Sequence, residues 1–165
     1  MHALPLKPHQ SGTTLSEVLI AVILLAFFFM SIFELNAICL RYIDASKESV
    51  ATLQLVQDRS EVLRNLAFSD LTSTSYLQGL LGAPANGSDI TKKVTEVVKV
   101  SQYPIASGVT QLTRNPNGTV TTNSLATDLG KTLVQVDVSA TWNMTLGGRA
   151  RSTQVTSVVS NGTKK

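Results

Sequence analysis

A long apolar stretch dominates the first quarter of the chain. Residues 18–33 contain no charged side chain, and after Glu34 the apolar character resumes as far as Leu40. As a single helix, residues 18–40 would be about 35 Å long, enough to cross a hydrocarbon core of about 30 Å. The rest of the chain is too small to surround a helix that is apolar on every side, and residues 33–37 offer no small-x-small site for secretory cleavage. The pattern therefore predicts a membrane segment.

The helical pattern continues beyond the apolar stretch and changes character. Residues 41–68 contain no glycine or proline, and apolar side chains recur at spacings of three, four and seven, which predicts an amphipathic helix. These side chains are Ile43, Val50, Leu53, Val56, Leu63 and Leu66. The charged side chains are expected to form a solvated face: Arg41, Lys47, Glu48, Asp58, Arg59, Glu61 and Arg64. A helix over residues 15–68 would be about 80 Å long, so lipid or similar helices must bury its first half while the second half packs on its own domain.

The remainder of the chain favours strands. Residues 72–92 are rich in Ser, Gly and Asn and are expected to form a loop, and residues 93–103 are rich in β-branched residues. Residues 109–114 and 119–122 flank Asn115-Pro116-Asn117-Gly118, which suits a hairpin with a type I turn. Residues 133–144 are expected to form a strand, because residues 134–143 alternate between apolar and polar, and residues 150–159 return as a partner strand. Together these segments predict an α+β fold in which an antiparallel sheet over residues 93–160 lies on the amphipathic helix.

Composition and charge narrow the range of functions. The 165 residues are 43% hydrophobic and only 15% charged, which is consistent with one domain carrying an appendage. The net charge of +3 is small and evenly spread, so it does not favour a nucleic-acid partner. Cys39 is the single cysteine and excludes an intrachain disulfide, and the two histidines, His2 and His9, precede the apolar stretch.

An acidic residue stands directly before the apolar stretch. A charged Glu17 at that depth is costly and requires a partner. If the chain were cut after Gly12, the new amine on Thr13 would lie four residues before Glu17, on the same face of the helix. The same pairing could form between neighbouring subunits.

The segment around this glutamate resembles a known signature. Its sequence, Gly12-Thr13-Thr14-Leu15-Ser16-Glu17-Val18-Leu19-Ile20-Ala21, is similar to the G-F-T-L-I-E-V-L-I-A motif of type IV pilins and pseudopilins, with eight of ten positions in agreement. The resemblance implies that a prepilin peptidase cuts between Gly12 and Thr13, that the Thr13 amine is methylated, and that Glu17 is the assembly glutamate. It divides the chain into a leader (1–12), a hydrophobic assembly helix (13–40) and an extracytoplasmic head (41–165). Thr13 and Ser16 depart from the motif.

The resemblance also implies a location and a set of partners. The precursor would span the bacterial inner membrane once, with its head in the periplasm or outside, and would then enter a cell-surface or periplasmic filament. Its partners would be other pilin or pseudopilin subunits, the prepilin peptidase, the inner-membrane assembly platform and membrane lipid. The closing pattern Trp142…Gly147-Gly148-Arg149-x-Arg151 is also similar to minor pilins and pseudopilins, and favours a minor over a major subunit. Type IV pilus, type II secretion pseudopilus and competence filament all remain open.

Catalytic chemistry finds no support in the sequence. Without residues 1–12 no histidine remains for a nucleophile pair or a metal site, and no glycine-rich phosphate loop is present, so neither an enzyme nor a cofactor is expected. The alternative function is a membrane-anchored binding module, such as a competence-type pilin that contacts DNA. It would require convergence of six cations: Lys92, Lys93, Lys99, Arg114, Arg149 and Arg151. The structural role is favoured, with Trp142 as a core residue packed on the helix.

Overall fold

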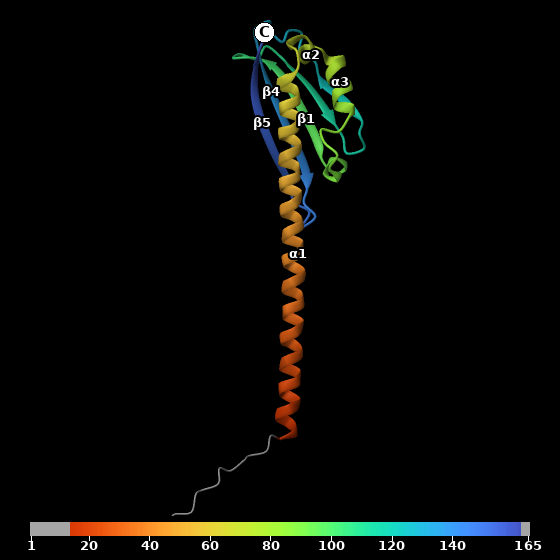
Figure 1. Ribbon diagram of the computed structural model, residues 1–165, viewed down its shortest axis with the longest axis vertical. Helices are drawn as coiled ribbons and strands as arrows, with labels where there is room; N and C mark the ends of the chain where they lie inside the picture. The colour runs from red at the N-terminus through yellow and green to blue at the C-terminus, as the bar shows by residue number, and fades with distance from the viewer. Residues whose placement is uncertain (1–13, 163–165) are drawn as a thin grey trace, which may run out of the picture. The chain divides into compact units, whose positions relative to one another are not determined.

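The computed structural model describes residues 14–162 and has an α+β fold, which confirms the predicted class. Helix α1 (Leu15–Asn65) is followed by the short helices α2 (Phe68–Thr72) and α3 (Thr74–Gly82) and by the 3-10 turn η1 (Asp89–Lys92). The strands are β1 (Thr95–Gln102), β2 (Val109–Arg114), β3 (Val120–Ser124), β4 (Leu133–Asn143) and β5 (Ala150–Ser160). The described chain separates into two units, with the boundary between Leu40 and Arg41. In the second unit, which we call the head, α1 packs against the sheet (Figure 1).

The five strands form one antiparallel sheet in the order β3-β2-β1-β4-β5. Strands β1, β2 and β3 follow one another as a meander, and β4 and β5 form a long hairpin. The central pairing, between β1 and β4, joins Thr95 to Thr141 and Gln102 to Val134. The sheet is therefore built from two locally connected pieces that meet at a contact distant in sequence.

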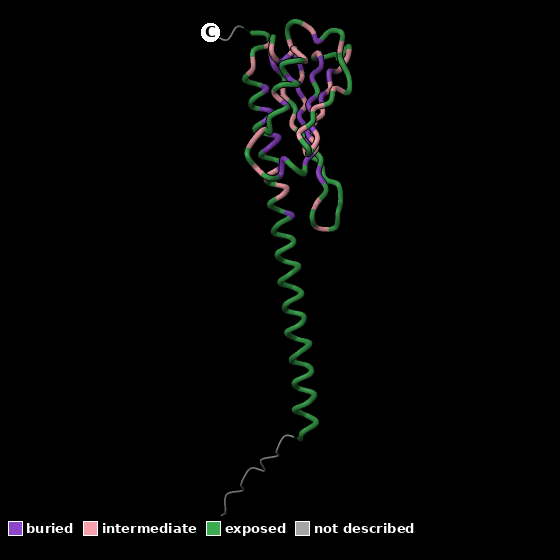
Figure 2. The backbone as a smooth tube through the Cα atoms, turned by 90° about the vertical axis from the view of Figure 1, so that its right-hand side faces the viewer, coloured by how far each residue is buried: buried purple, intermediate pink, exposed green. Residues whose placement is uncertain are grey.

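The alternation predicted for residues 133–144 is confirmed in β4. Alternate side chains of this strand, from Val134 to Trp142, are buried, and the residues between them are half-buried or exposed. Buried side chains of the sheet, of α1 and of α3 form one core, which appears as the buried part of the head in Figure 2. Trp142 belongs to this core and is 7% exposed, as expected.

The predicted hairpin over residues 109–122 is also confirmed. The Gly118 amide donates to the Asn115 carbonyl at 2.9 Å, and the Asn115 amide donates to the Thr119 carbonyl at 2.9 Å. Gly118 has a φ of 85°, a left-handed conformation that favours glycine at this position. Turn chemistry that can be identified in the sequence thus fixes how β2 pairs with β3.

Two predicted boundaries are wrong. The long helix ends at Asn65 rather than at residue 68, and a new short helix begins at Phe68. Residues 72–92 are not a loop, because they form all of α3 and all of η1. Helix α3 is stabilised by Ser73, whose hydroxyl accepts from the Tyr76 amide, and by burial of Leu77 and Leu81. Burial of leucines outweighs the helix-breaking tendency of its glycines, about 1 kcal/mol each.

The buried face of α1 also differs from the prediction. Of the six apolar side chains expected to face the core, Val56 and Leu63 are buried, and Leu66 is half-buried. Ile43, Val50 and Leu53 are 49%, 53% and 42% exposed, respectively. The face that meets the sheet instead carries Ala45, Thr52, Leu55, Val56, Arg59, Ser60 and Leu63. Apolar residues occupy more than one face of α1, so their spacing alone did not select the face that the sheet covers.

Candidate functional site

The predicted assembly residue Glu17 caps the first turn of α1. Its carboxylate accepts a hydrogen bond from the Thr14 amide at 3.0 Å, and the Glu17 amide donates to the Thr14 hydroxyl at 3.4 Å. This reciprocal pair, formed by a threonine before the helix and a glutamate three residues later, is a capping box. It satisfies two backbone amides that have no partner within a helix. The T-x-x-E spacing was visible in the sequence, but the position of Glu17 before an apolar stretch indicated only a cationic partner.

The proposed processing site lies outside the described residues. Gly12 and Thr13, the predicted cleavage site and methylation site, precede residue 14, where the description of the structure begins. Cleavage and methylation therefore remain predictions. The structure shows that α1 begins at Leu15, two residues after Thr13.

The first part of α1 is an apolar surface. Large apolar side chains from Leu15 to Leu40 are exposed along its length. Within residues 14–162, α1 is the one helix long and apolar enough to cross a membrane, which is consistent with a single membrane span or a signal sequence. An uncovered apolar surface of this extent requires lipid or protein around it.

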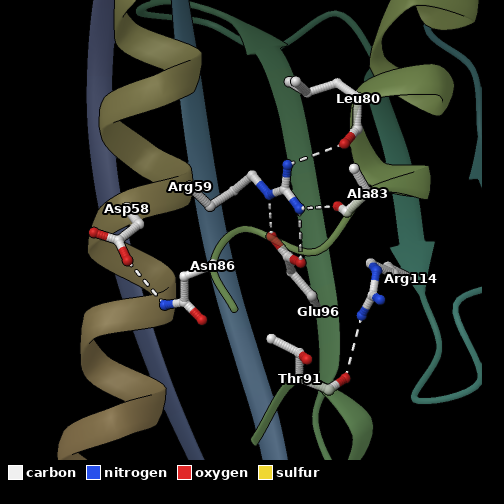
Figure 3. Close-up of polar contacts among 8 residues, drawn as sticks. All are labelled: Asp58, Arg59, Leu80, Ala83, Asn86, Thr91, Glu96 and Arg114. Atoms are coloured by element: carbon white, nitrogen blue, oxygen red, sulfur yellow. Dashed lines mark hydrogen bonds and ion pairs between the residues drawn. The ribbon is translucent and has the colours of Figure 1, made fainter. Parts of the chain in front are cut away.

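The head contains a buried ion pair that sequence reasoning missed. Arg59 on α1 donates from Nε to Glu96 Oε1 on β1 at 2.5 Å, and from Nη2 to Glu96 Oε2 at 3.4 Å (Figure 3). The two side chains are 3% and 2% exposed. Arg59 also donates to the carbonyls of Leu80 and Ala83 at 3.1 and 2.8 Å, at the end of α3 where helix carbonyls have no internal partner. One guanidinium thus joins α1, α3 and β1.

The expectation that Arg59 belongs to a solvated face is therefore wrong. A signal for its burial was present, because Arg59 follows Leu55 and precedes Leu63 by four residues each. Glu96 likewise alternates with Val94 and Val98, which are buried. A charged residue at a core position of each element indicates a buried pair, since neither charge can be buried alone.

A second polar contact ties α1 to the turn between β4 and β5. The Glu48 carboxylate accepts from the Thr145 amide at 3.0 Å, from the Thr145 hydroxyl, and from the Lys93 ammonium at 3.4 Å. Burial raises the pKa of this carboxyl, but the hydrogen bonds from Thr145 and the charge of Lys93 outweigh it, so the pKa of Glu48 lies below its usual value. Glu48 is therefore charged at neutral pH and holds the turn against the helix.

The six cations considered for DNA binding do not converge on a free surface. Arg114 is buried and donates to the Thr91 carbonyl at 3.2 Å (Figure 3). Lys92 pairs with Asp89 at 2.8 Å, and Lys93 pairs with Glu48. The other three are exposed and pair with no carboxylate within residues 14–162: Lys99 on the uncovered face of β1, Arg149 in the turn between β4 and β5, and Arg151 at the start of β5. Among the described residues, no group of three or more His, Cys, Asp or Glu side chains could hold a metal ion.

No protein-family model, curated protein or solved structure matches this chain. The architecture itself is nevertheless distinctive, with a long apolar N-terminal helix whose continuation packs on a small antiparallel sheet. It is pilin-like. This pilin-like architecture, the capped Glu17 and the apolar surface of α1 form the candidate functional site.

Proposed function

We propose that the protein is a structural subunit of a type IV pilus or a type II secretion pseudopilus, of the minor pilin or pseudopilin kind. The observation that carries the proposal is the start of α1, where a glutamate in the first turn immediately precedes an uncovered apolar stretch of the helix. Such a helix can be buried by lipid before assembly and by parallel copies of similar helices after it. The head then needs no catalytic group, because its role is to be displayed on the filament.

Processing is the first step to test. The precursor would be cut by a prepilin peptidase between Gly12 and Thr13, and the subunit would remain in the inner membrane through residues 18–40. N-terminal sequencing or intact-mass measurement of the membrane-extracted protein should give Thr13 as the first residue. A start at Met1, or at any residue after Phe33, would refute the proposal.

Glu17 would contribute to assembly through its charge. In a helix bundle an unpaired carboxylate is strongly disfavoured, so it would accept the Thr13 amine of its own or an adjacent subunit. The Thr14 amide, which Glu17 caps at 3.0 Å, would then share the carboxylate with that amine or give it up. Capping and charge pairing are two different contributions, and variants can separate them.

Three variants separate these contributions. Glu17→Ala removes both contributions, Glu17→Gln keeps a capping side chain without the charge, and Thr14→Ala removes the threonine hydroxyl but leaves the charge. We expect all three to insert and to be cut. Recovery in sheared filaments should fall most for Glu17→Ala, be intermediate for Glu17→Gln and stay near wild type for Thr14→Ala. Without the Glu17 carboxylate the buried Thr13 amine would lose its counter-charge, which costs about 3–5 kcal/mol. Loss of a helix cap costs only about 1 kcal/mol, and this difference supports the expected order.

Two outcomes of that experiment argue against the mechanism. Wild-type recovery of Glu17→Ala would show that the carboxylate is not an assembly contact. Equal defects in Glu17→Ala and Thr14→Ala would assign the effect to the helix end rather than to charge. The membrane fraction of each variant serves as the control for expression and insertion.

DNA binding is the less supported alternative. It needs the six cations to converge on one surface, whereas Arg114 is buried and Lys93 bonds to Glu48, whose side chain is 12% exposed. These contacts favour the structural role.

A further inference from the structure

The back of α1 in the head carries an open apolar groove that nothing in residues 14–162 covers. Its volume is about 370 Å³. The lining residues are Ile43, Ser46, Lys47, Val50, Ala51 and Gln54. Ile43 and Val50, seven residues or nearly two turns apart, lie on one face of the helix and are about half exposed. They were expected in the core, so their exposure calls for another partner.

The groove lies beyond the segment that lipid would cover. Its lining residues all follow Leu40, where the apolar segment ends, so a hydrocarbon core matched to residues 18–40 does not extend to them. Burial of the apolar side chains of the groove therefore calls for a protein partner.

Glu34 identifies the chemistry of that partner. It is the single charged residue between Val18 and Leu40, and it makes no hydrogen bond or ion pair within the described part of the chain. An ionisable residue in such a segment needs an opposite charge from outside its own helix.

Lys47 supplies the matching charge in the groove. Its ammonium lies 3.7 Å from Asp44, but both side chains are mostly exposed, at 73% and 67%, and an exposed pair of this kind contributes little. Lys47 can therefore turn to a second carboxylate without losing a strong contact. The groove thus combines apolar walls with one cation, and the apolar segment of this chain combines apolar side chains with one carboxylate.

We propose that the groove of one copy receives the apolar helix of a second, parallel copy, with Glu34 of the incoming copy paired to Lys47 of the receiving copy. The two copies are displaced along the helix axis by about thirteen residues, or about 20 Å. Groove and carboxylate belong to different parts of the chain, so each copy can donate to one neighbour and receive another, and the displacement along the axis lets the contact propagate without closing. This inference rests on the proposed function and specifies which surfaces meet in the assembly.

Charge exchange between two copies tests the pairing. Two differently tagged full-length chains are produced together, extracted from the membrane in mild detergent and tested for co-purification. When both copies carry Glu34→Lys, or both carry Lys47→Glu, like charges meet and co-purification should fall at least fivefold. When one copy carries Glu34→Lys and the other carries Lys47→Glu, opposite charges meet whichever copy provides the groove. Co-purification should then return to within twofold of wild type.

Matched controls separate this contact from general effects. Arg41→Glu reverses an exposed cation of α1 that lies outside the groove, and it should neither lower co-purification nor rescue Glu34→Lys. Val50→Ser, in the groove, should lower co-purification without changing the unfolding of the head. Val158→Ser, at an exposed valine on β5, should leave both unchanged.

The outcomes distinguish this inference from the proposed function. Wild-type co-purification of both single variants, or failure of the mixed pair to recover, would overturn the contact between copies even if the protein is cut after Gly12 and enters filaments. A protein that is never cut at Gly12 would overturn the proposed function, while the charge exchange would still report on self-association. Loss in both single variants with recovery in the mixed pair supports the contact.

Discussion

Removal of the Glu96 carboxylate is expected to destabilise the head strongly. In Glu96→Ala the Arg59 guanidinium keeps its contacts with the Leu80 and Ala83 carbonyls but loses both hydrogen bonds to the carboxylate. It remains in a site where its side chain is 3% exposed. A buried charge left without its counter-ion costs about 3–5 kcal/mol, a large part of the 5–15 kcal/mol that stabilises a typical domain.

Arg59→Met should cost at least as much. It leaves the Glu96 carboxylate unpaired and also removes the donor to two carbonyls, each worth about 1–3 kcal/mol if it stays buried without a partner. The double variant Arg59→Met/Glu96→Met removes both charges and fills the space with apolar atoms. It should therefore be less destabilised than either single variant, because only the two carbonyls lose a partner.

The measurement is urea unfolding of a fragment spanning residues 41–165, followed by circular dichroism and by the fluorescence of Trp142, the only tryptophan. The coupling in the double-mutant cycle should reach about 3 kcal/mol or more. Lys92→Ala, which breaks the exposed pair with Asp89, is the matched control and should change stability little. Additive single effects, within about 0.5 kcal/mol, would refute the claim that Arg59 and Glu96 form a buried pair.

Three further predictions concern the head. The fragment spanning residues 41–165 should be soluble and show β signal by circular dichroism, because it keeps the sheet, the face of α1 that packs on it and the core between them. Aggregation would show that the division at Leu40 is misplaced. Trp142→Ala should lower the unfolding free energy of this fragment by about 3–5 kcal/mol, because the ring is buried in the core. Trp142→Phe should lower it much less, because the indole nitrogen has no hydrogen-bond partner within residues 14–162. A near-neutral Ala variant in urea unfolding would place the ring outside the core. The lowered pKa of Glu48 stabilises the head above the ordinary pKa of glutamate, about 4.3, and this stabilisation is lost as the pH falls through the lower folded value. Urea unfolding between pH 7 and pH 3 should therefore show the advantage of wild type over Glu48→Gln shrinking below about pH 4, and a pH-independent difference would argue against a charged contact.

Local patterns predicted much of the fold. The alternation in β4, the turn at Asn115–Gly118 and the uninterrupted helix each depend on neighbouring residues, so the sequence was enough to identify them. Helix α3 was missed because its two glycines resemble a loop locally, whereas the burial of Leu77 and Leu81 that stabilises it depends on the tertiary fold.

The candidate site was predicted less completely. Glu17 could be singled out from its position before the apolar segment, but its capping contact with Thr14 required the observed start of the helix. The Arg59–Glu96 pair joins residues 37 positions apart, and only their packing in three dimensions shows that they meet. The exposed groove at Val50 was not predicted, because the spacing of apolar residues does not show which face of the helix the sheet will cover.

The central position of β1 has a consequence for how the head is made. Its pairing with β4 joins residues 95–102 to residues 134–141, so the middle of the sheet cannot close until β4 has left the ribosome and, if the protein is a pilin-type subunit as proposed, has crossed the membrane. On the proposed route, α1 is by then already anchored, and its core-facing side, including Arg59, still faces water. A chain arrested before β4 would thus be a tethered helix with an open, partly charged core face, a substrate for membrane proteases and chaperones. We expect quality control of this protein to act at the arrival of β4, well after insertion and before any filament contact is made.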